Sequence, residues 1–234
     1  MDTTRTGGSD LNADEYRDKV FLPEIRTEAG RINVGTVFLV EFEGEPFFVT
    51  ALHLFGPGGG LKRTIPTEAL SGEVSLVQLH DAVTDEVVYD GLVPIDTDFG
   101  EPLSPVSDAP DASGDIVVFQ SPEQPFGQPL QLRDDPGPNA GDALYLVSYQ
   151  RTVSGGGLGR FRLKLIDSTD EFFVMELEDS VDLYGMSGAP IVDEDGLVVS
   201  MGVGGLTDPR GRERHLGVPL VGLRSYLGRV MELM

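Results

Sequence analysis

Short runs of apolar and β-branched residues, separated by Gly, Pro and Asp, dominate the pattern of this chain. Residues 35–55, GTVFLVEFEGEPFFVTALHLF, are apolar on both sides of a Glu-Gly-Glu-Pro turn signal, which predicts a β-hairpin whose strands meet at residues 43–46. About ten short strands at this spacing are typical of an all-β sandwich or barrel. The other candidate strands lie at 73–80, 86–95, 114–120, 143–150, 160–167, 171–178, 189–204 and 215–222.

Only the two ends of the chain show a helical pattern. Residues 12–25, NADEYRDKVFLPEI, begin with a candidate cap at Asn12 and an acidic first turn, which predicts a short helix that ends before Pro23. Residues 218–234, VPLVGLRSYLGRVMELM, carry apolar side chains at helical spacing and predict a closing helix packed on the second half. The Pro- and Gly-dense stretch 121–142 separates two roughly equal sets of strands and is the candidate linker.

Composition excludes several classes of function. The chain has 234 residues, with 17 Lys plus Arg against 39 Asp plus Glu and a net charge of −22, so nucleic acids and anionic membranes are not expected partners. It has no cysteine and only three scattered histidines, so we expect no disulfide, metal or other cofactor. Because no apolar run is long enough for a signal peptide or a membrane span, we expect a cytoplasmic protein.

One serine stands in a turn that is suited to a nucleophile. Ser187 lies in DLYGMSGAPIVDEDG, flanked by Gly185-Met186 and by Gly188. A serine hydroxyl hydrolyses peptide bonds at neutral pH only if a base takes its proton and a third group orients that base. Taken alone, however, such a sequence is equally typical of a plain turn.

The three histidines are the candidate bases. His53 closes the second strand of the predicted hairpin, His80 ends the predicted strand 73–80, and His215 lies in the charged loop DPRGRERH. An orienting carboxylate is usually buried, and Asp115, directly before the apolar run IVVF, fits best. Asp111 is a weaker candidate because its Pro/Ser/Gly-rich surroundings indicate exposure.

Three short segments resemble one known family. VTALH at 49–53, GDIVV at 114–118 and GMSGAPIV at 185–192 are similar to the His, Asp and Ser motifs of the chymotrypsin-like (trypsin-like) serine peptidases, in the family's own order. The resemblance spans residues 33–225 and implies a double β-barrel with a short N-terminal helix and a C-terminal helix. The expected divisions are an N-terminal segment 1–28, a first barrel 29–122 with His53 and Asp115, a linker 123–142, and a second barrel 143–234 with Ser187 and the closing helix.

The resemblance also implies roles for residues. It makes Ser187 the nucleophile, His53 the general base and Asp115 the orienting carboxylate, with the oxyanion hole formed by the backbone N–H groups of Gly185 and Ser187. The expected activity is that of a serine endopeptidase that hydrolyses protein or peptide substrates through an acyl-enzyme. Val181 is expected at the floor of the substrate pocket, which favours an uncharged side chain on the substrate. The pocket walls are expected to include Gly202, Gly204 and Gly205. If the loop were shifted by one residue, Asp182 would take the floor position and select a basic side chain.

Two departures from the family pattern change the expectation. Secreted members have an aspartate where this chain has Met186, and they have disulfides where this chain has none, so it resembles intracellular bacterial or HtrA-like members more closely. We therefore expect activity without N-terminal cleavage. A cytoplasmic protease without a propeptide still needs restraint, for which we expect either a regulatory protein partner or a mobile active-site loop. The alternative is a catalytically silent, protease-like module that binds peptides or acts as a scaffold. An α/β-hydrolase is disfavoured because Ala189 replaces the last glycine of its motif.

Overall fold

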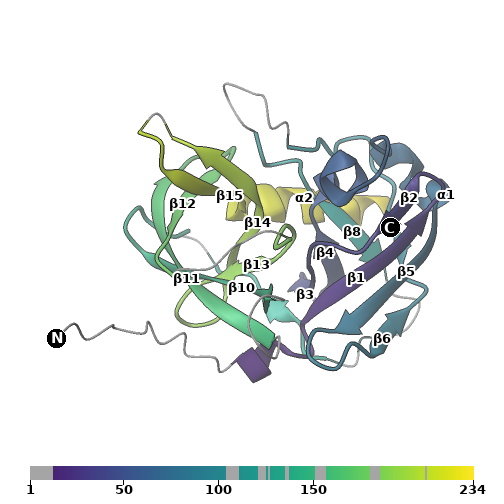
Figure 1. Ribbon diagram of the computed structural model, residues 1–234, viewed down its shortest axis with the longest axis horizontal. Coiled ribbons are helices and arrows are strands. Elements are labelled where there is room, and N and C mark those ends of the chain that lie inside the picture. The colour runs from purple at the N-terminus through teal and green to yellow at the C-terminus, as the bar shows by residue number, and fades with distance from the viewer. Residues whose placement is uncertain are drawn as a thin grey trace.

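Two β-structures lie side by side in the computed structural model, and the helix α2 (Leu220–Leu233) runs along both of them (Figure 1). The structure describes residues 13–103, 111–120, 125, 127–134, 137–150, 157–179, 185–208 and 210–234. One β-structure is built from the first part of the chain and the other from the second part, as the strand pattern predicted. The all-β fold class is therefore confirmed.

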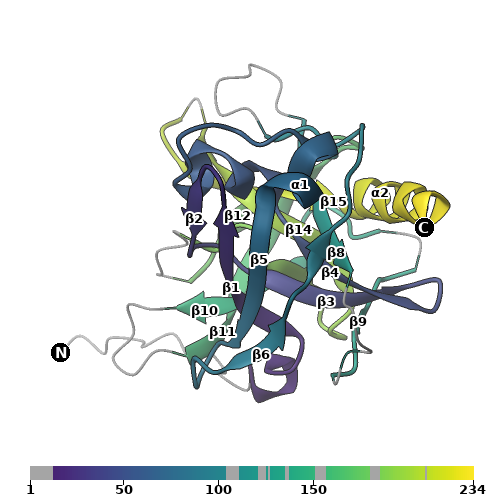
Figure 2. The same ribbon diagram turned by 90° about the vertical axis from the view of Figure 1, so that its right-hand side faces the viewer.

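The first β-structure is a twisted sheet with the strand order β6-β5-β1-β3-β4-β8-β7, in which β2 also pairs with β1 and β9 with β3 (Figure 2). The predicted hairpin is formed by β3 and β4, and its turn residues Glu43 and Gly44 have φ values of 53° and 87°. Two consecutive positive φ values are typical of the tight hairpin turns that match strand twist. The strands are β1 (Val20–Thr27), β2 (Gly30–Ile32), β3 (Val37–Phe42), β4 (Glu45–Thr50), β5 (Val74–Asp81), β6 (Val87–Asp90), β7 (Val93–Pro94), β8 (Val117–Gln120) and β9 (Leu130–Gln131).

The second β-structure is a closed barrel with the strand order β10-β11-β12-β15-β14-β13. Along its longest strand, Phe161, Leu163 and Leu165 are buried, whereas the residues between them are exposed. This alternation sends every second side chain into the barrel, where a separate apolar core forms. The strands are β10 (Ala143–Gln150), β11 (Gly157–Ser168), β12 (Phe173–Leu177), β13 (Pro190–Val192), β14 (Val198–Thr207) and β15 (Glu213–Pro219).

The closing helix α2 joins the two halves. Its buried residues Leu223, Tyr226, Leu227 and Val230 recur at helical spacing, as predicted. The helix packs on β14 and β15, and the Tyr226 hydroxyl also lies 3.1 Å from the Thr97 hydroxyl of the first half. In the part of the chain that the structure describes, no helix is long and apolar enough to cross a membrane.

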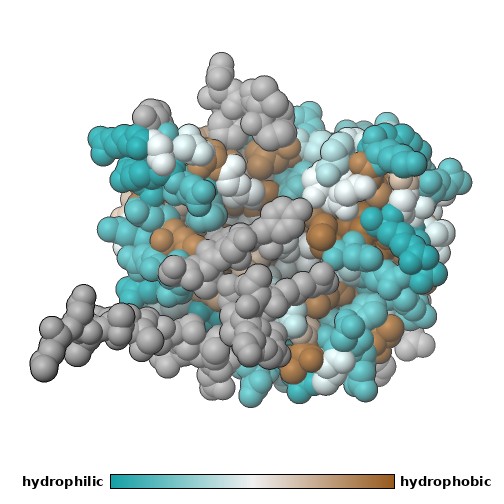
Figure 3. All heavy atoms as spheres, in the orientation of Figure 1, coloured by the Kyte–Doolittle hydropathy of each residue, from teal (hydrophilic) through white to brown (hydrophobic). Residues whose placement is uncertain are grey.

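The remaining helices are short. They are the 3-10 helices η1 (Ala13–Tyr16), η2 (Leu52–Phe55), η3 (Pro57–Gly59) and η4 (Thr67–Ala69), and the single-turn α1 (Leu70–Glu73). Hydrophilic residues cover much of the described surface on the face that Figure 3 shows, with apolar patches between them.

The N-terminal region departs from the sequence prediction. The predicted helix is one 3-10 turn, η1, and the residues that follow form β1 instead of continuing the helix; Asn12 lies outside the described residues. Pro23 fits in β1 because the strand is paired there on one side only, with β5, and proline lacks the N–H that a second ladder would need. The first sheet thus takes in residues 20–27, which the prediction assigned to the N-terminal segment, and β9, which it assigned to the linker.

Candidate active site

His53 and Asp115 form a closely bonded pair at the end of two neighbouring strands. His53 lies in η2, three residues after β4, and not at the strand end that the sequence predicted. Because β4 and β8 are antiparallel neighbours, the end of β4 meets the segment that leads into β8, which contains Asp115. His53 Nδ1 lies 2.7 Å from Asp115 Oδ2, and the His53 backbone N–H donates to Asp115 Oδ1 over 2.7 Å.

The burial of Asp115 gives this pair its chemical meaning. The carboxylate is 0% exposed, whereas the imidazole is 16% exposed. A carboxylate that accepts a hydrogen bond from the protonated Nδ1 fixes the tautomer of the ring and leaves the unprotonated Nε2 to act as a base. Asp111, the weaker candidate, instead accepts hydrogen bonds from the backbone N–H and the hydroxyl of Ser113. The structure therefore brings Asp115, and not Asp111, to His53.

Ser187 lies in a tight turn directly before β13. The glycines on either side of Met186-Ser187, Gly185 and Gly188, both have φ of 84°, a left-handed conformation that favours glycine. The Gly188 N–H donates to the Gly202 carbonyl over 2.7 Å, which fixes the turn to β14. The described hydrogen bonds include none between the Ser187 hydroxyl and His53, so the geometry shows one of the two links of a triad.

Three residues with buried hydroxyl groups lie where the Ser187 turn meets the first half. We call Thr36, Thr50 and Ser148 the junction cluster. The Thr36 N–H donates to the Ser187 carbonyl over 2.8 Å, and the Thr36 carbonyl accepts from the Thr50 hydroxyl over 2.7 Å. The Thr36 and Ser148 hydroxyls are 2.9 Å apart across the two halves. Since Thr50 ends β4, the cluster links the Ser187 turn to the strand that precedes His53.

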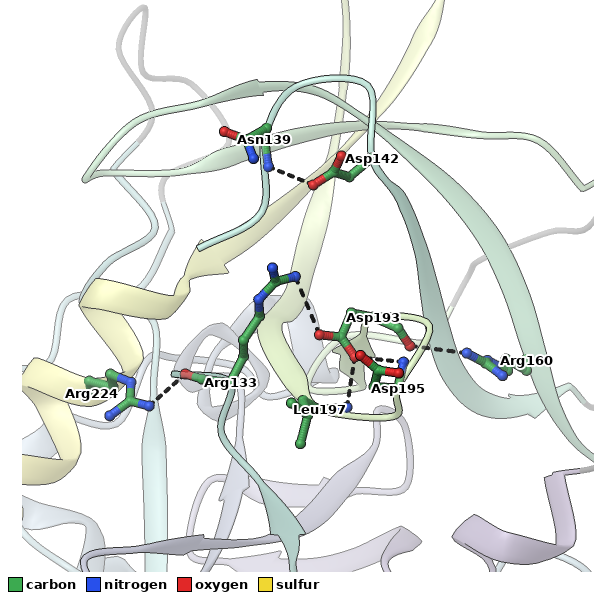
Figure 4. A network of polar contacts seen from close by, with 8 residues as sticks. All are labelled: Arg133, Asn139, Asp142, Arg160, Asp193, Asp195, Leu197 and Arg224. Carbon is green, nitrogen blue, oxygen red and sulfur yellow. Dashed lines mark hydrogen bonds and ion pairs between the residues drawn. The ribbon is translucent and has the colours of Figure 1, made fainter. Parts of the chain in front are cut away.

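A polar network holds the opposite end of the β13–β14 hairpin (Figure 4). The Asp193 carboxylate accepts from two backbone N–H groups of its own turn and lies 3.3 Å from Arg133 Nη1. Arg160 donates to the Asp193 carbonyl over 3.0 Å, and Arg224 of α2 donates to the Arg133 carbonyl. The hairpin that begins at the Ser187 turn is therefore fixed to β11, to the segment after β9 and to α2.

A cavity of about 760 Å³ opens beside Ser187 and Gly185. Much of its wall is apolar and comes from the second barrel, and the predicted wall residues Gly202, Gly204 and Gly205 line it as well. Val181 and Asp182, the predicted floor and its alternative, lie outside the described residues. The apolar lining includes Leu146, Leu163, Met175, Leu177, Met186 and Ile191.

The other two histidines have different surroundings. The ring of His80 lies in β5, with Nδ1 3.0 Å from the Asp85 carbonyl and Nε2 4.0 Å from Glu24, so its polar neighbours belong to the first sheet. His215, which the sequence placed at the end of a charged loop and the start of the candidate strand 215–222, lies inside β15 and lines the cavity beside Ser187. The strand begins two residues earlier than predicted, at Glu213, within the charged run that indicated a loop.

Other functional residues carried little signal in the sequence. Thr50 is part of the VTALH segment, but Thr36 and Ser148 have no motif that connects them to Ser187. Within the described residues, no group of three or more His, Cys, Asp or Glu side chains has the arrangement of a metal site.

Solved structures of other proteins share the fold of this chain. No protein-family model matches the chain, and no curated protein sequence matches it. Among solved structures, the active form of the Rv3671c protease from M. tuberculosis is similar at a TM-score of 0.60 and 12% identity, covering 93% of this chain and 83% of that one. The serine endoprotease from Yersinia pestis has a TM-score of 0.61 and 12% identity, covering 96% and 67%. Neuropsin, a serine protease of mouse brain, has a TM-score of 0.58 and 14% identity, covering 93% and 96%. The chain therefore has the double β-barrel fold of the chymotrypsin-like serine proteases, as the resemblance of its three motifs predicted.

Proposed function

We propose that this protein is a serine endopeptidase in which Ser187, His53 and Asp115 form the catalytic triad. The observation that carries the proposal is the His53–Asp115 pair, in which a fully buried carboxylate accepts from both the ring and the backbone of one histidine. The Ser187 turn, which is bonded through the junction cluster to the strand before His53, supports the proposal. The solved structures that share this fold are serine proteases, which supports it further.

The chemistry follows from these positions. The Ser187 hydroxyl oxygen attacks the carbonyl carbon of the scissile bond while its proton passes to His53 Nε2, and Asp115 stabilises the imidazolium that results. In this proposal the oxyanion that forms accepts hydrogen bonds from the backbone N–H groups of Gly185 and Ser187. His53 then gives its proton to the nitrogen of the leaving amine as the carbon–nitrogen bond breaks, which leaves an acyl ester on Ser187.

Hydrolysis of the acyl ester completes the cycle. Water attacks the ester carbonyl and gives a proton to His53 Nε2, and the carbon–oxygen bond to Ser187 breaks as that proton returns to the serine oxygen. The Ser187–His53 contact must close for both steps, and such contacts in free enzymes commonly tighten only when substrate binds.

The cavity beside Ser187 supports an uncharged side chain on the acyl side of the cleaved bond. Its walls are rich in Leu and Met side chains, and its two charged lining residues, Glu213 and Arg214, both stand at the start of β15. Burying a charge against the apolar part of the wall is unfavourable unless a partner of opposite charge is present. We propose Gly202, Gly204 and Gly205 as walls of this pocket and Val181 as its floor. A pocket with Asp182 at the floor would instead select Lys or Arg, and cleavage of a diverse peptide library distinguishes the two.

Labelling with a fluorophosphonate tests the proposed function. Only an activated serine reacts readily with this probe, so the wild-type protein should be labelled and should hydrolyse peptides, whereas Ser187→Ala should do neither. Ser75→Ala removes an exposed serine on β5 and should behave like the wild type. A folded wild-type protein that binds peptides but is not labelled would refute the enzyme and establish the silent peptide-binding module.

A further inference from the structure

His215 points into the second barrel. In the β-sheet register, His215 of β15 lies opposite Met175 of β12 and opposite Gly205 of β14. Residues that face each other across a ladder have their side chains on the same side of the sheet. Since Met175 belongs to the inner core of the barrel, the imidazole is on the inner side too, where it lines the cavity beside Ser187.

Two charged residues, Glu213 and Arg214, precede His215 on β15, and both also line the cavity. Arg214, the preceding residue, alternates to the outer side, where its guanidinium lies 3.0 Å from Glu176 and 3.4 Å from Asp208. Glu213 begins the strand, lies on the same side of the sheet as His215 because it is two residues away, and is exposed. The imidazole is thus the partly buried titratable side chain of this stretch of β15, with Glu213 beside it at the exposed end of the strand.

The imidazole is a hydrogen-bonding group without a partner among the described residues. It is partly buried, and the described hydrogen bonds include none to its ring nitrogens. Burial lowers its pKa, with Arg214 lowering it further and Glu213 opposing both, so the ring is neutral at neutral pH. A neutral ring offers one donor and one acceptor, and the ring lines a cavity to which several Leu and Met side chains contribute.

We infer that His215 is a specificity-determining residue that binds the hydroxyl of a tyrosine side chain on the acyl side of the cleaved bond. This inference rests on the proposed function. A phenol ring suits the Leu and Met walls, and its hydroxyl supplies the partner that the imidazole lacks. A phenylalanine fills the same volume but leaves the imidazole without a hydrogen bond, and a site that offers a polar group selects against a ligand that cannot use it.

Charged side chains fit this site less well. A carboxylate would require a protonated imidazole, against the lowered pKa of His215 and next to the negative charge of Glu213. An ammonium or guanidinium group would meet a neutral ring and, in the same lining, the like charge of Arg214; the carboxylate of the lining, Glu213, is exposed to water and offsets little of the desolvation.

Two peptides that differ only in tyrosine or phenylalanine at this position test the inference. We expect the wild type to cleave the tyrosine peptide with a kcat/KM about tenfold higher, as one net hydrogen bond would give. His215→Leu should reduce the ratio to about one by losing only the tyrosine advantage, while His215→Gln, which keeps a donor and an acceptor, should retain a preference. His80→Leu makes the same substitution in the first sheet and should leave the ratio unchanged.

A binding experiment separates this inference from the proposed function. The Ser187→Ala variant should bind the two peptides without cleaving them, so its affinities report the fit of each side chain in the cavity alone. The tyrosine peptide should again bind more tightly. If wild-type protein is not labelled by a fluorophosphonate, the proposed function fails. Equal binding of the two peptides, or a tyrosine preference that survives in His215→Leu, would overturn the role of His215 whether or not the protein is an enzyme.

Discussion

Replacing Gly188 with alanine tests whether the Ser187 turn is clamped between the two halves. The N–H of Gly188 donates to Gly202, and its α-carbon faces the junction cluster. A Cβ at this position would clash with the Thr36 carbonyl oxygen and the Thr50 hydroxyl, and would lie 3.1 Å from the Ala51 nitrogen. Two of these three atoms are backbone, so a side-chain rotation cannot make room.

Gly185 provides a matched control. It has the same φ of 84°, but among the described residues no atom beyond its chain neighbours lies within 4 Å of the position that a Cβ would take. Alanine should therefore cost only the left-handed strain at Gly185, about 1–2 kcal/mol. At Gly188 the same strain is joined by overpacking of about 1–3 kcal/mol, for a total of roughly 2–5 kcal/mol.

Urea unfolding followed by far-UV circular dichroism measures both variants. The midpoint should fall further for Gly188→Ala than for Gly185→Ala, with an unchanged slope in each case. Fluorophosphonate labelling of folded Gly188→Ala should also slow, because the turn must move away from Thr36 to admit the methyl group. Equal losses of stability in the two variants, to within about 0.5 kcal/mol, would refute the clamped turn.

Three further predictions concern other parts of the structure. Asp115→Asn should lower kcat about 10⁴-fold by favouring the wrong tautomer of the catalytic histidine, while Asp111→Asn should leave it unchanged; the opposite result would reassign the carboxylate. Thr50→Val leaves the buried Thr36 carbonyl without its donor and should cost about 1–3 kcal/mol in urea unfolding, whereas Thr50→Ser should cost less because it keeps the hydroxyl; equal losses would contradict the hydrogen bond. Although burial raises the pKa of Asp81, hydrogen bonds from an arginine and two backbone N–H groups outweigh it and lower the pKa to about 2 from 3.8. Its contribution to stability is therefore complete above about pH 4 and is lost as pH falls toward 2, so the acid-induced loss of stability should be smaller in Asp81→Asn, and an identical loss would remove Asp81 as a cause.

Local features of the fold were contained in the sequence. The alternation along β11, the Glu-Gly turn between β3 and β4, and the apolar stripe of α2 each depend on residues a few positions apart. Side chains alternate along a strand and recur every three to four residues along a helix, so these patterns follow from burial and backbone sterics alone. The chymotrypsin-like double barrel was predicted because three short motifs stand in the family's order, and the similarity to solved structures confirms that fold.

The contacts that build the site were decided by tertiary structure. The sequence offered both Asp111 and Asp115, and only the pairing of β4 with β8 brings one of them to His53, 62 residues away. The bond between Thr36 and Ser148 joins positions 112 residues apart, and no local pattern indicates it.

Two sequence predictions were wrong in part because they, too, depended on contacts between distant strands. Pro23 ended a predicted helix, yet it fits in β1 because one edge of that strand is unpaired there. The charged run before His215 hid the first two residues of β15, and only the strand register shows that the imidazole points inward. Amino-acid patterns determine which segments become strands and which side of each is apolar, because those properties depend on neighbours along the chain. Which residues face one another across the two halves depends on register between distant strands, and that is fixed only when the cores pack.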